Sequence, residues 1–171
     1  MQRVWFERAF ELGLPRSHAL EIVERLRGTP ARLEERLHGV GRDILLRRPA
    51  VDGSASWSIQ EHVGHLVDLE ALWLARVDDL AEGADVLTEA DLENRATWDA
   101  GHNERPLDDV LASFRSHRAT LVSRLESLGD DGWSSTSLHP RLRQPMSAVD
   151  LAFFVAEHDD HHLATIGLLL A

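Results

Sequence analysis

Apolar residues recur every three or four positions along most of the chain, the spacing that places them on one face of an α-helix. Alternating runs of β-branched residues, which are typical of strands, are almost absent. The pattern therefore predicts an all-α protein with four long helices and shorter helices near the N-terminus. We expect the short helices at residues 2–12 and 15–28, and the long ones at residues 30–48, 58–81, 107–128 and from about 147 onward.

Residues that favour helix ends support two of these boundaries. The second short helix is expected to stop at Gly28, because Thr29 followed by Pro30 is typical of an N-cap and a first helical residue. Ser58 and Glu61 match a capping box, in which each side chain accepts a hydrogen bond from the backbone N–H of the other residue. A new helix is therefore expected to begin at each of these two places.

Long polar connections at residues 82–106 and 129–145 separate the last three long helices, and a further loop is expected at residues 49–57. A bundle in which each helix runs antiparallel beside the previous one needs only short turns, so these lengths argue against that simple topology. The chain of 171 residues, 43% of them hydrophobic, is suited to one core, and residues 1–171 are expected to form a single domain. The predicted fold is a four-helix bundle with long connections.

Charge and residue usage exclude several classes of function. The formal net charge is −11, from 29 acidic and 18 basic residues, so the average field repels nucleic acids and anionic membranes. Lysine is absent, and the arginines are scattered singly or in pairs such as Arg47 and Arg48, so no function is assigned to them. Without cysteine there is no thiolate nucleophile and no cysteine-ligated metal centre, and any metal ligands must be histidine or carboxylate.

No segment has the character of a signal peptide or a membrane span. Residues 1–13 mix charged and apolar side chains, unlike the uninterrupted apolar stretch of a signal peptide. The longest apolar run, LAFFVA at residues 151–156, is far too short to cross a bilayer. We therefore expect a cytoplasmic protein without nucleic-acid or membrane partners.

The segment EHDDHHLATI, residues 157–166, places ionisable side chains in an otherwise apolar helix. His158 and His162 are four residues apart and point about 40° from each other on the helical wheel. Leu151, Phe154 and Ile166 share their face, so both imidazoles are expected to lie toward the core. Two imidazoles at this spacing can hold one divalent ion, but a catalytic metal usually has three protein ligands.

A third ligand has to come from another helix. His62 and His65, in the segment SIQEHVGHLVDLE, are the candidates. A single histidine on an apolar face is more often a hydrogen-bonded core residue than a ligand, so histidines that merely bond to one another are a competing interpretation. His158 is followed by Asp159 and not by the glutamate of an HExxH motif, which argues against a zinc protease of that type.

WSIQEHVGHLVDLEALWLARV and, about ninety residues later, AEHDDHHLATI together resemble the DinB/YfiT-like superfamily of four-helix metalloproteins. The resemblance extends through GTPARLEERL, WDAGHN and HPRLRQPM and covers essentially the whole chain. In that family one histidine of the second bundle helix and two histidines of the last helix, separated by three residues, bind a divalent metal. Carried over position by position, the resemblance implies His65, His158 and His162 as ligands, with His62 and His161 as neighbours.

The resemblance also implies an activity. Characterised relatives include metal-dependent transferases and isomerases that use small thiols, so the implied function is a thiol S-transferase or a hydrolase acting on a small molecule. Zinc and nickel are the first candidates for the ion, although imidazole also suits iron and copper. Because the chain lacks cysteine, a thiol would have to be a low-molecular-weight cosubstrate.

Further side chains and alternatives follow from the same reasoning. Glu61, Asp68 and His161 are candidates for acid–base catalysis, and the loop with His102 and Asn103 is expected to cap the pocket. A non-catalytic metal-binding or stress-response bundle is the alternative function. Relatives often pair, so a homodimer is one expectation for the oligomeric state.

Overall fold

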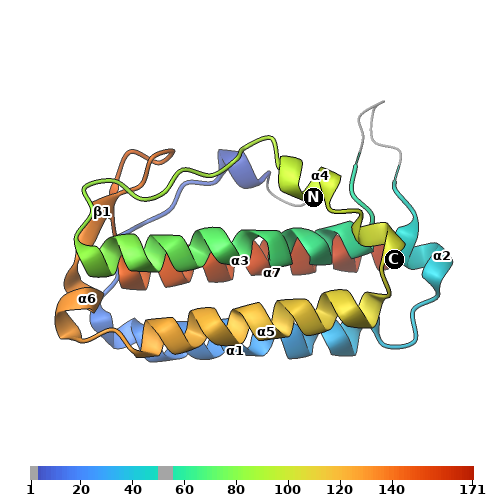
Figure 1. The fold of residues 1–171 in the computed structure, drawn as a ribbon, viewed down its shortest axis with the longest axis horizontal. Coiled ribbons are helices and arrows are strands. Elements are labelled where there is room, and N and C mark those ends of the chain that lie inside the picture. Colours follow the sequence, from blue (N-terminus) through green and yellow to red (C-terminus); the bar gives the residue numbers. More distant parts are fainter. Residues whose placement is uncertain (1–3, 50–55) are drawn as a thin grey trace.

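The computed structural model describes residues 4–49 and 56–171, which form a four-helix bundle (Figure 1). The long helices are α1 (Ala19–Leu37), α3 (Ile59–Glu82), α5 (Leu107–Glu126) and α7 (Ala148–Leu170). Between them lie shorter pieces: η1 (Trp5–Glu7), η2 (Arg16–His18), α2 (Arg42–Leu46), α4 (Arg95–Asp99), η3 (His102–Glu104) and α6 (Asp130–Ser134). Strands β1 (Thr136–Leu138) and β2 (Pro145–Ser147) pair in an antiparallel hairpin.

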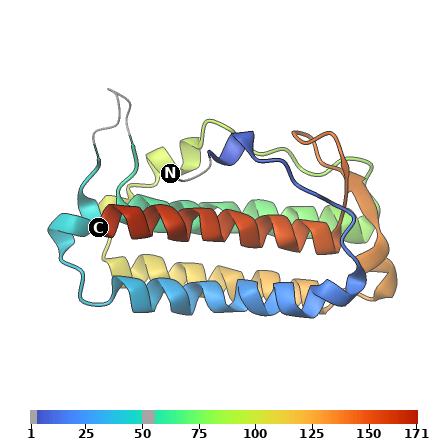
Figure 2. The ribbon, with the colours of Figure 1, turned by 180° about the vertical axis from the view of Figure 1, so that it is seen from behind.

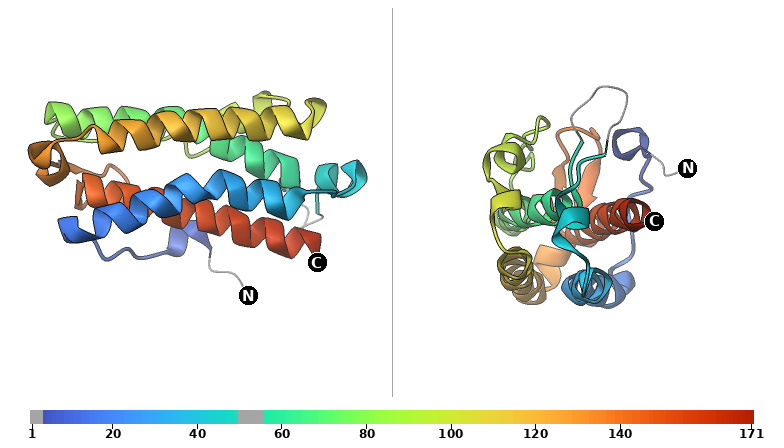
Figure 3. Two further views of the ribbon diagram at one scale, coloured as in Figure 1. Left: turned by 90° about the horizontal axis from the view of Figure 1, so that it is seen from below. Right: turned by 90° about the vertical axis from the view of Figure 1, so that its right-hand side faces the viewer.

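The order of the helices around the bundle confirms that the topology is not simply up-down-up-down. α1 packs against α5 and α7, and α3 packs against the same two helices. The long helices α1 and α3, which follow each other in the chain, therefore lie on one diagonal, and α5 and α7 lie on the other (Figure 3). α3 and α5 run in the same direction, so residues 83–106 return along the length of the bundle before α5 begins (Figure 1).

The connecting segments gather on one side of the bundle. The N-terminal segment with η1, the connection that carries α4, and the β1–β2 hairpin all lie over α3 and α7 (Figures 2 and 3). Helices α1 and α5 form the opposite side. Among the helices of residues 4–49 and 56–171, none combines the length and the apolar content that crossing a membrane requires.

A layer of buried polar side chains separates two apolar clusters in the core. One cluster contains Trp73, Leu121 and Phe154, and the other contains Leu33 and Phe114. Between them each long helix contributes a residue to one hydrogen-bonded network, and all four residues are at most 3% exposed. These residues are Thr29 of α1, Glu70 of α3, Arg118 of α5 and Asp159 of α7.

Arg118 bonds to all three other helices through this layer. Its Nε and Nη2 donate to Glu70 Oε1 at 3.0 and 2.5 Å, and its Nη1 and Nη2 donate to the carboxylate of Asp159. Nη1 also donates to the backbone oxygen of Leu26 at 3.3 Å, and Thr29 Oγ1 donates to Asp159 Oδ2 at 2.8 Å. Burial raises the pKa of Glu70 to about 7, and the charge of Asp159 adds to this increase while Arg118 opposes it.

The same network explains why the predicted break at residues 28–30 is wrong. α1 continues through Gly28, Thr29 and Pro30. Pro30 has no N–H to donate to the oxygen of Leu26, which normally costs a helix about 3 kcal/mol. Arg118 donates to that oxygen instead. The proline is therefore tolerated because of a contact from another helix, which the local sequence does not reveal.

Other boundaries also differ from the sequence prediction. The helix predicted to reach residue 48 ends at Leu37, followed by Gly39 with φ of 73° and by the separate α2. The N-terminal helix is reduced, from residue 4 onward, to the single turn η1, and residues 2–3 lie outside the described part, as do residues 50–55 of the predicted loop. The hairpin was not predicted, because strands of three residues are too short to show alternation.

The predicted capping box at the start of α3 is present, and α7 begins with a second one. Ser58 Oγ accepts from the N–H of Glu61 at 3.1 Å, and the N–H of Ser58 donates to Glu61 Oε2 at 2.9 Å. Ser147 and Asp150 form the equivalent pair at the start of α7. These two helices, which carry the histidine segments, therefore begin at positions that the sequence fixes locally.

Replacing Arg118 by methionine leaves two buried carboxylates without a counter-charge and removes the donor to Leu26. Loss of one partner from a buried ion pair costs about 3–5 kcal/mol, and we expect the free energy of unfolding to fall by this amount in urea titrations. Arg115→Met is the control, since it removes an exposed pair with Glu34 one turn away and should cost less than about 1 kcal/mol. If both variants lost the same free energy of unfolding, the buried ion pairs would contribute no more to stability than the exposed pair.

The pKa of Glu70 predicts how stability changes with pH. With a folded-state value of about 7 and an unfolded value near 4.5, Glu70 stabilises the fold most below about pH 4.5, and this contribution is lost as pH rises through 7. Glu70→Gln has an uncharged side chain at every pH. The free energy of unfolding of the wild type should therefore fall by up to about 3 kcal/mol relative to that of Glu70→Gln when the pH is raised from 4.5 to 8. Urea titrations of both proteins at the two pH values measure this difference, in which the histidine contributions cancel. A constant difference would contradict the raised pKa.

Candidate metal centre

α3 and α7 bring His65, His158 and His162 together on the side of the bundle that the connections cover. One ring nitrogen of each lies within 4.8 Å of the others, and the three side chains are buried. The Nε2 atoms of His158 and His162 are 3.2 Å apart. Two nitrogens on one tetrahedral zinc, with bonds of 2.0–2.1 Å, are separated by about 3.3 Å. The spacing of this pair therefore fits a shared ion.

Two of the three imidazoles have a partner for their second ring nitrogen. His65 Nδ1 is 3.0 Å from Thr97 Oγ1, and His162 Nδ1 is 2.9 Å from His62 Nδ1. If these Nδ1 atoms carry the proton, each ring presents an unprotonated Nε2 to the common point, which is the tautomer that a metal ligand needs. His158 Nδ1 is buried and has no hydrogen-bond partner among the residues that the structure describes.

Burial keeps these histidines uncharged at neutral pH. Desolvation lowers the pKa of His65 to about 3 and that of His62 to about 4. The pKa values of His158 and His162 are also lowered well below the usual histidine value, first by burial and then by the neighbouring histidines. Neutral imidazoles keep a lone pair, so the site is ready to bind a cation without first losing protons.

The competing interpretation, histidines that bond only to one another, explains part of this geometry. A distance of 3.2 Å between the nitrogens of His158 and His162 also suits a weak hydrogen bond. That interpretation gives no reason for His65 to lie beside the pair, since the ring of His65 forms its hydrogen bond with Thr97. A shared ion accounts for all three positions.

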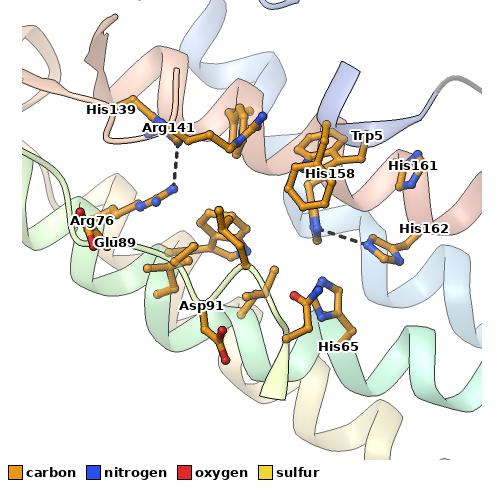
Figure 4. A pocket seen from close by; sticks show the side chains of 18 of the residues that line it. Trp5, His65, Arg76, Glu89, Asp91, His139, Arg141, His158, His161 and His162 are labelled. Carbon is orange, nitrogen blue, oxygen red and sulfur yellow. Dashed lines mark hydrogen bonds between the residues drawn. The ribbon is translucent and has the colours of Figure 1, made fainter. Parts of the chain in front are cut away.

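The histidines lie at one end of a cavity with a volume of about 410 Å³, which is within the range of small-molecule sites. Its walls are largely aromatic, and Trp5, Trp57, Trp73 and Phe154 contribute to them. The opposite end carries a group of basic side chains, and the close-up view shows both ends facing the same space (Figure 4). These basic residues are Arg76, His139 and Arg141.

The structure separates the three residues predicted for acid–base catalysis. Glu61 belongs to the capping box and forms an ion pair with Arg48, and Asp68 accepts a hydrogen bond from His102 Nε2 at 2.9 Å. Neither residue lines the cavity, whereas His161 does. Burial, together with the charge of Arg8, lowers the pKa of His161, so this ring is neutral at pH 7, and its Nδ1 accepts from Arg8 Nη2 at 3.3 Å.

The loop that carries His102 was expected to cap the pocket, but residues 89–92 and Asn94, earlier in the same connection, line it instead. His102 packs on Gly64 of α3 so closely that a Cβ at Gly64 would overlap its ring. Gln60 holds the same segment by donating to the backbone oxygens of His102 and Arg105. These contacts fix the segment on α3.

The connection between α3 and α5 also holds one of the candidate metal ligands in place. α4 precedes His102 by a few residues, and it carries Thr97, the hydrogen-bond partner of His65. Thr97 is buried and α4 contacts α3. The orientation of the His65 ring therefore depends on how the connection between α3 and α5 is seated.

Sequence reasoning missed several residues of the cavity. Arg76 is not one of them, because it follows His65 by eleven residues on α3 and the helical wheel places it close to the same face. Trp5, His139 and Arg141 lie in segments that fold over the bundle from elsewhere in the chain. Periodicity carries no signal for these three.

Two solved structures share the fold. YfiT from Bacillus subtilis, described as a probable metal-dependent hydrolase with an unusual four-helix bundle topology, aligns with a TM-score of 0.76 and 20% identity over 95% of this chain and 91% of its own. A mycothiol-dependent maleylpyruvate isomerase aligns with a TM-score of 0.69 and 15% identity over 90% of this chain. The chain spans 61% of that isomerase. At these identities the likeness shows the fold alone.

Sequence comparison gives the family. No curated protein matches the chain. The model of the DinB superfamily matches residues 25–166, which include all of α3 and α5, most of α1 and α7, and the three histidines of the candidate metal centre. On this match, the chain belongs to the DinB superfamily.

Proposed function

We propose that this protein is a metal-dependent enzyme that acts on a small organic molecule, with a divalent ion held by His65, His158 and His162. The observation that carries the proposal is the position of three buried, neutral imidazoles at the end of a cavity of about 410 Å³. The donor set consists of imidazole nitrogen alone, which suits zinc and nickel, the first candidates, and also iron and copper.

Three neutral ligands leave a divalent ion its full charge and an open position, so it would act as a Lewis acid that lowers the pKa of water or of a thiol. The chain contributes no thiol of its own, since it has no cysteine. The reaction is therefore hydrolysis or transfer to a low-molecular-weight thiol cosubstrate. The descriptions of YfiT as a probable hydrolase and of the isomerase as mycothiol-dependent support these two classes.

The residues of the chain have defined tasks in this proposal. Thr97 and His62 orient the rings of His65 and His162 through their second nitrogens. The tryptophans of the wall exclude water from the reacting end of the cavity. His161 lies beside His162 and lines the cavity, and we assign it as the acid–base group, with Arg8 as the partner of its Nδ1. Cytoplasmic location and a homodimer remain predictions.

The metal content of the protein tests the first half of the proposal. Protein purified without a histidine tag should carry about one equivalent of a transition metal per chain, measured by mass spectrometry of the elements. His158→Ala and His162→Ala should each reduce this content at least tenfold. His117→Ala, on an exposed stretch of α5, should leave it unchanged. A wild-type protein without metal, and with no effect of His158→Ala, would support histidines that merely bond to one another.

Activity tests the second half. The metal-loaded protein should hydrolyse members of an ester and amide panel, or conjugate electrophiles with a cellular thiol, and chelation should abolish the activity. If neither reaction occurs with any member, the non-catalytic metal-binding protein becomes the better description. His161→Gln should then separate the steps in an active enzyme, because it should lower kcat more than it raises KM.

Thr97→Val removes the oxygen that faces His65 Nδ1 while keeping the side-chain volume. Loss of such a ligand-orienting hydrogen bond usually reduces metal affinity by 10- to 100-fold, and we expect a loss of about tenfold in competition with a coloured chelator. Gly64→Ala should have a similar effect by displacing His102 and the segment that carries Thr97. Thr120→Val, on the exposed face of α5, is the control. Unchanged affinity in both test variants would show that this segment does not position His65.

A further inference from the structure

The end of the cavity away from the histidine triad carries two arginines that no carboxylate pairs. Arg76 is 2% exposed and Arg141 is half-buried. Neither forms an ion pair within residues 4–49 and 56–171, whereas the other fully buried arginine, Arg118, contacts two carboxylates. Burial of a guanidinium without a counter-charge is costly, so this part of the cavity is unusual for a purely structural arrangement.

Hydrogen-bond donors outnumber acceptors at this end. His139 Nδ1 accepts from the N–H groups of Arg141 and Leu142 at 3.2 and 3.1 Å, so the ring proton belongs on Nε2. Arg76 Nε donates to the backbone oxygen of Thr88 at 2.9 Å, but its Nη1 lies 3.2 Å from His139 Nε2, and both of these nitrogens are donors (Figure 4). Arg141 Nη2 is buried and finds no partner in the described part of the chain. Burial and the two arginines lower the pKa of His139 to about 4, so this ring is neutral at pH 7. Its one acceptor nitrogen, Nδ1, is already used by the two backbone N–H groups.

The nearby acidic residues do not supply the missing acceptors. Asp79 is close enough to favour the charged form of Arg76, but its Oδ2 accepts from the N–H and the hydroxyl of Thr88 at 2.6 and 2.8 Å. Glu89 and Asp91 line the cavity but are exposed, and neither pairs with these arginines. Burial lowers the pKa of Arg76 to about 10, which leaves it charged at pH 7.

Aromatic rings hold both guanidinium groups in place. Arg76 Cζ lies 5.4 Å from the ring centre of Trp73, and Arg141 Cζ lies 5.3 Å from that of Phe6 and 6.0 Å from that of Phe154. Along α3, the Cα atoms of His65 and Arg76 are about 16 Å apart, and the side chain of Arg76 leans back toward the triad. The wall between the two ends is apolar, with Leu69, Leu72 and Trp73.

We propose that Arg76, His139 and Arg141 form an oxyanion subsite, which selects small substrates that carry a carboxylate or a phosphate group on an apolar body. The apolar wall would hold the body of the substrate, and the far end of the molecule would lie at the histidine triad. The inference rests on the proposed function for the role of the triad, but binding of the anionic group involves the arginine end alone.

Calorimetric titration of the protein as purified tests the subsite with three probes of one shape: 4-phenylbutyrate, 4-phenylbutyl phosphate and the neutral 4-phenylbutan-1-ol. At least one of the two anions should bind at least tenfold more tightly than the alcohol, and the better of the two identifies the preferred group. Arg141→Gln should weaken the preferred anion at least fivefold and leave the alcohol within twofold. Arg143→Gln, two residues away but exposed and outside the cavity, is the matched control.

Two outcomes would overturn the subsite. The first is an alcohol that binds as tightly as both anions, and the second is a loss of anion binding in Arg143→Gln equal to that in Arg141→Gln. Arg76→Gln should repeat the result of Arg141→Gln if it folds, but the conclusion does not depend on this fully buried position.

His158→Ala separates this inference from the proposed function. If its anion binding persists and still depends on Arg141, the subsite stands regardless of whether wild-type protein holds a metal. If His158→Ala abolishes anion binding and Arg141→Gln does not, the anion binds at the triad, and the subsite is wrong while the metal centre is supported. Metal-free wild-type protein with binding that depends on Arg141 would contradict the proposed function alone.

Discussion

The contact on which the structure most depends is that of Arg118 with the carboxylates of Glu70 and Asp159. It joins α5 to α3 and α7, and through Leu26 and Thr29 to α1. Asp159 immediately follows His158, and successive helical residues point about 100° apart. When Asp159 faces Arg118 inside the bundle, His158 is turned toward α3. The ion pair in the core thereby sets the direction of the candidate metal ligands.

Such a network contributes more to a defined arrangement than to net stability. Burying three charged groups costs about as much as their attraction returns, and replacing all of them with apolar residues is often neutral. In this bundle α3 and α5 run parallel side by side, and α1 lies diagonal to α3 and α5 to α7, so apolar faces alone would allow several arrangements. We infer that the polar layer between the two apolar clusters fixes the rotation and the axial position of α7 against its neighbours.

The sequence could predict what depends on local spacing. The start of α3 follows from Ser58 and Glu61, and the shared face of His158 and His162 follows from helical geometry. The continuity of α1 through Pro30 could not be predicted, because a side chain of α5 satisfies the free carbonyl. The same limit applies to Arg141 in the hairpin connection, which reaches the cavity only after distant segments have folded over α3 and α7.

Burial explains the chemistry of both ends of the cavity. At one end, removal from water disfavours imidazolium and leaves neutral rings that suit a cation. At the other end, arginine keeps its proton despite burial, so the same removal from water leaves positive charge that suits an anion. The chain as a whole carries a charge of −11, and salt screens it beyond about 8 Å, so long-range attraction does not draw anions in. Selection for an anionic group must therefore come from close contact inside the cavity, where low polarity strengthens each charge.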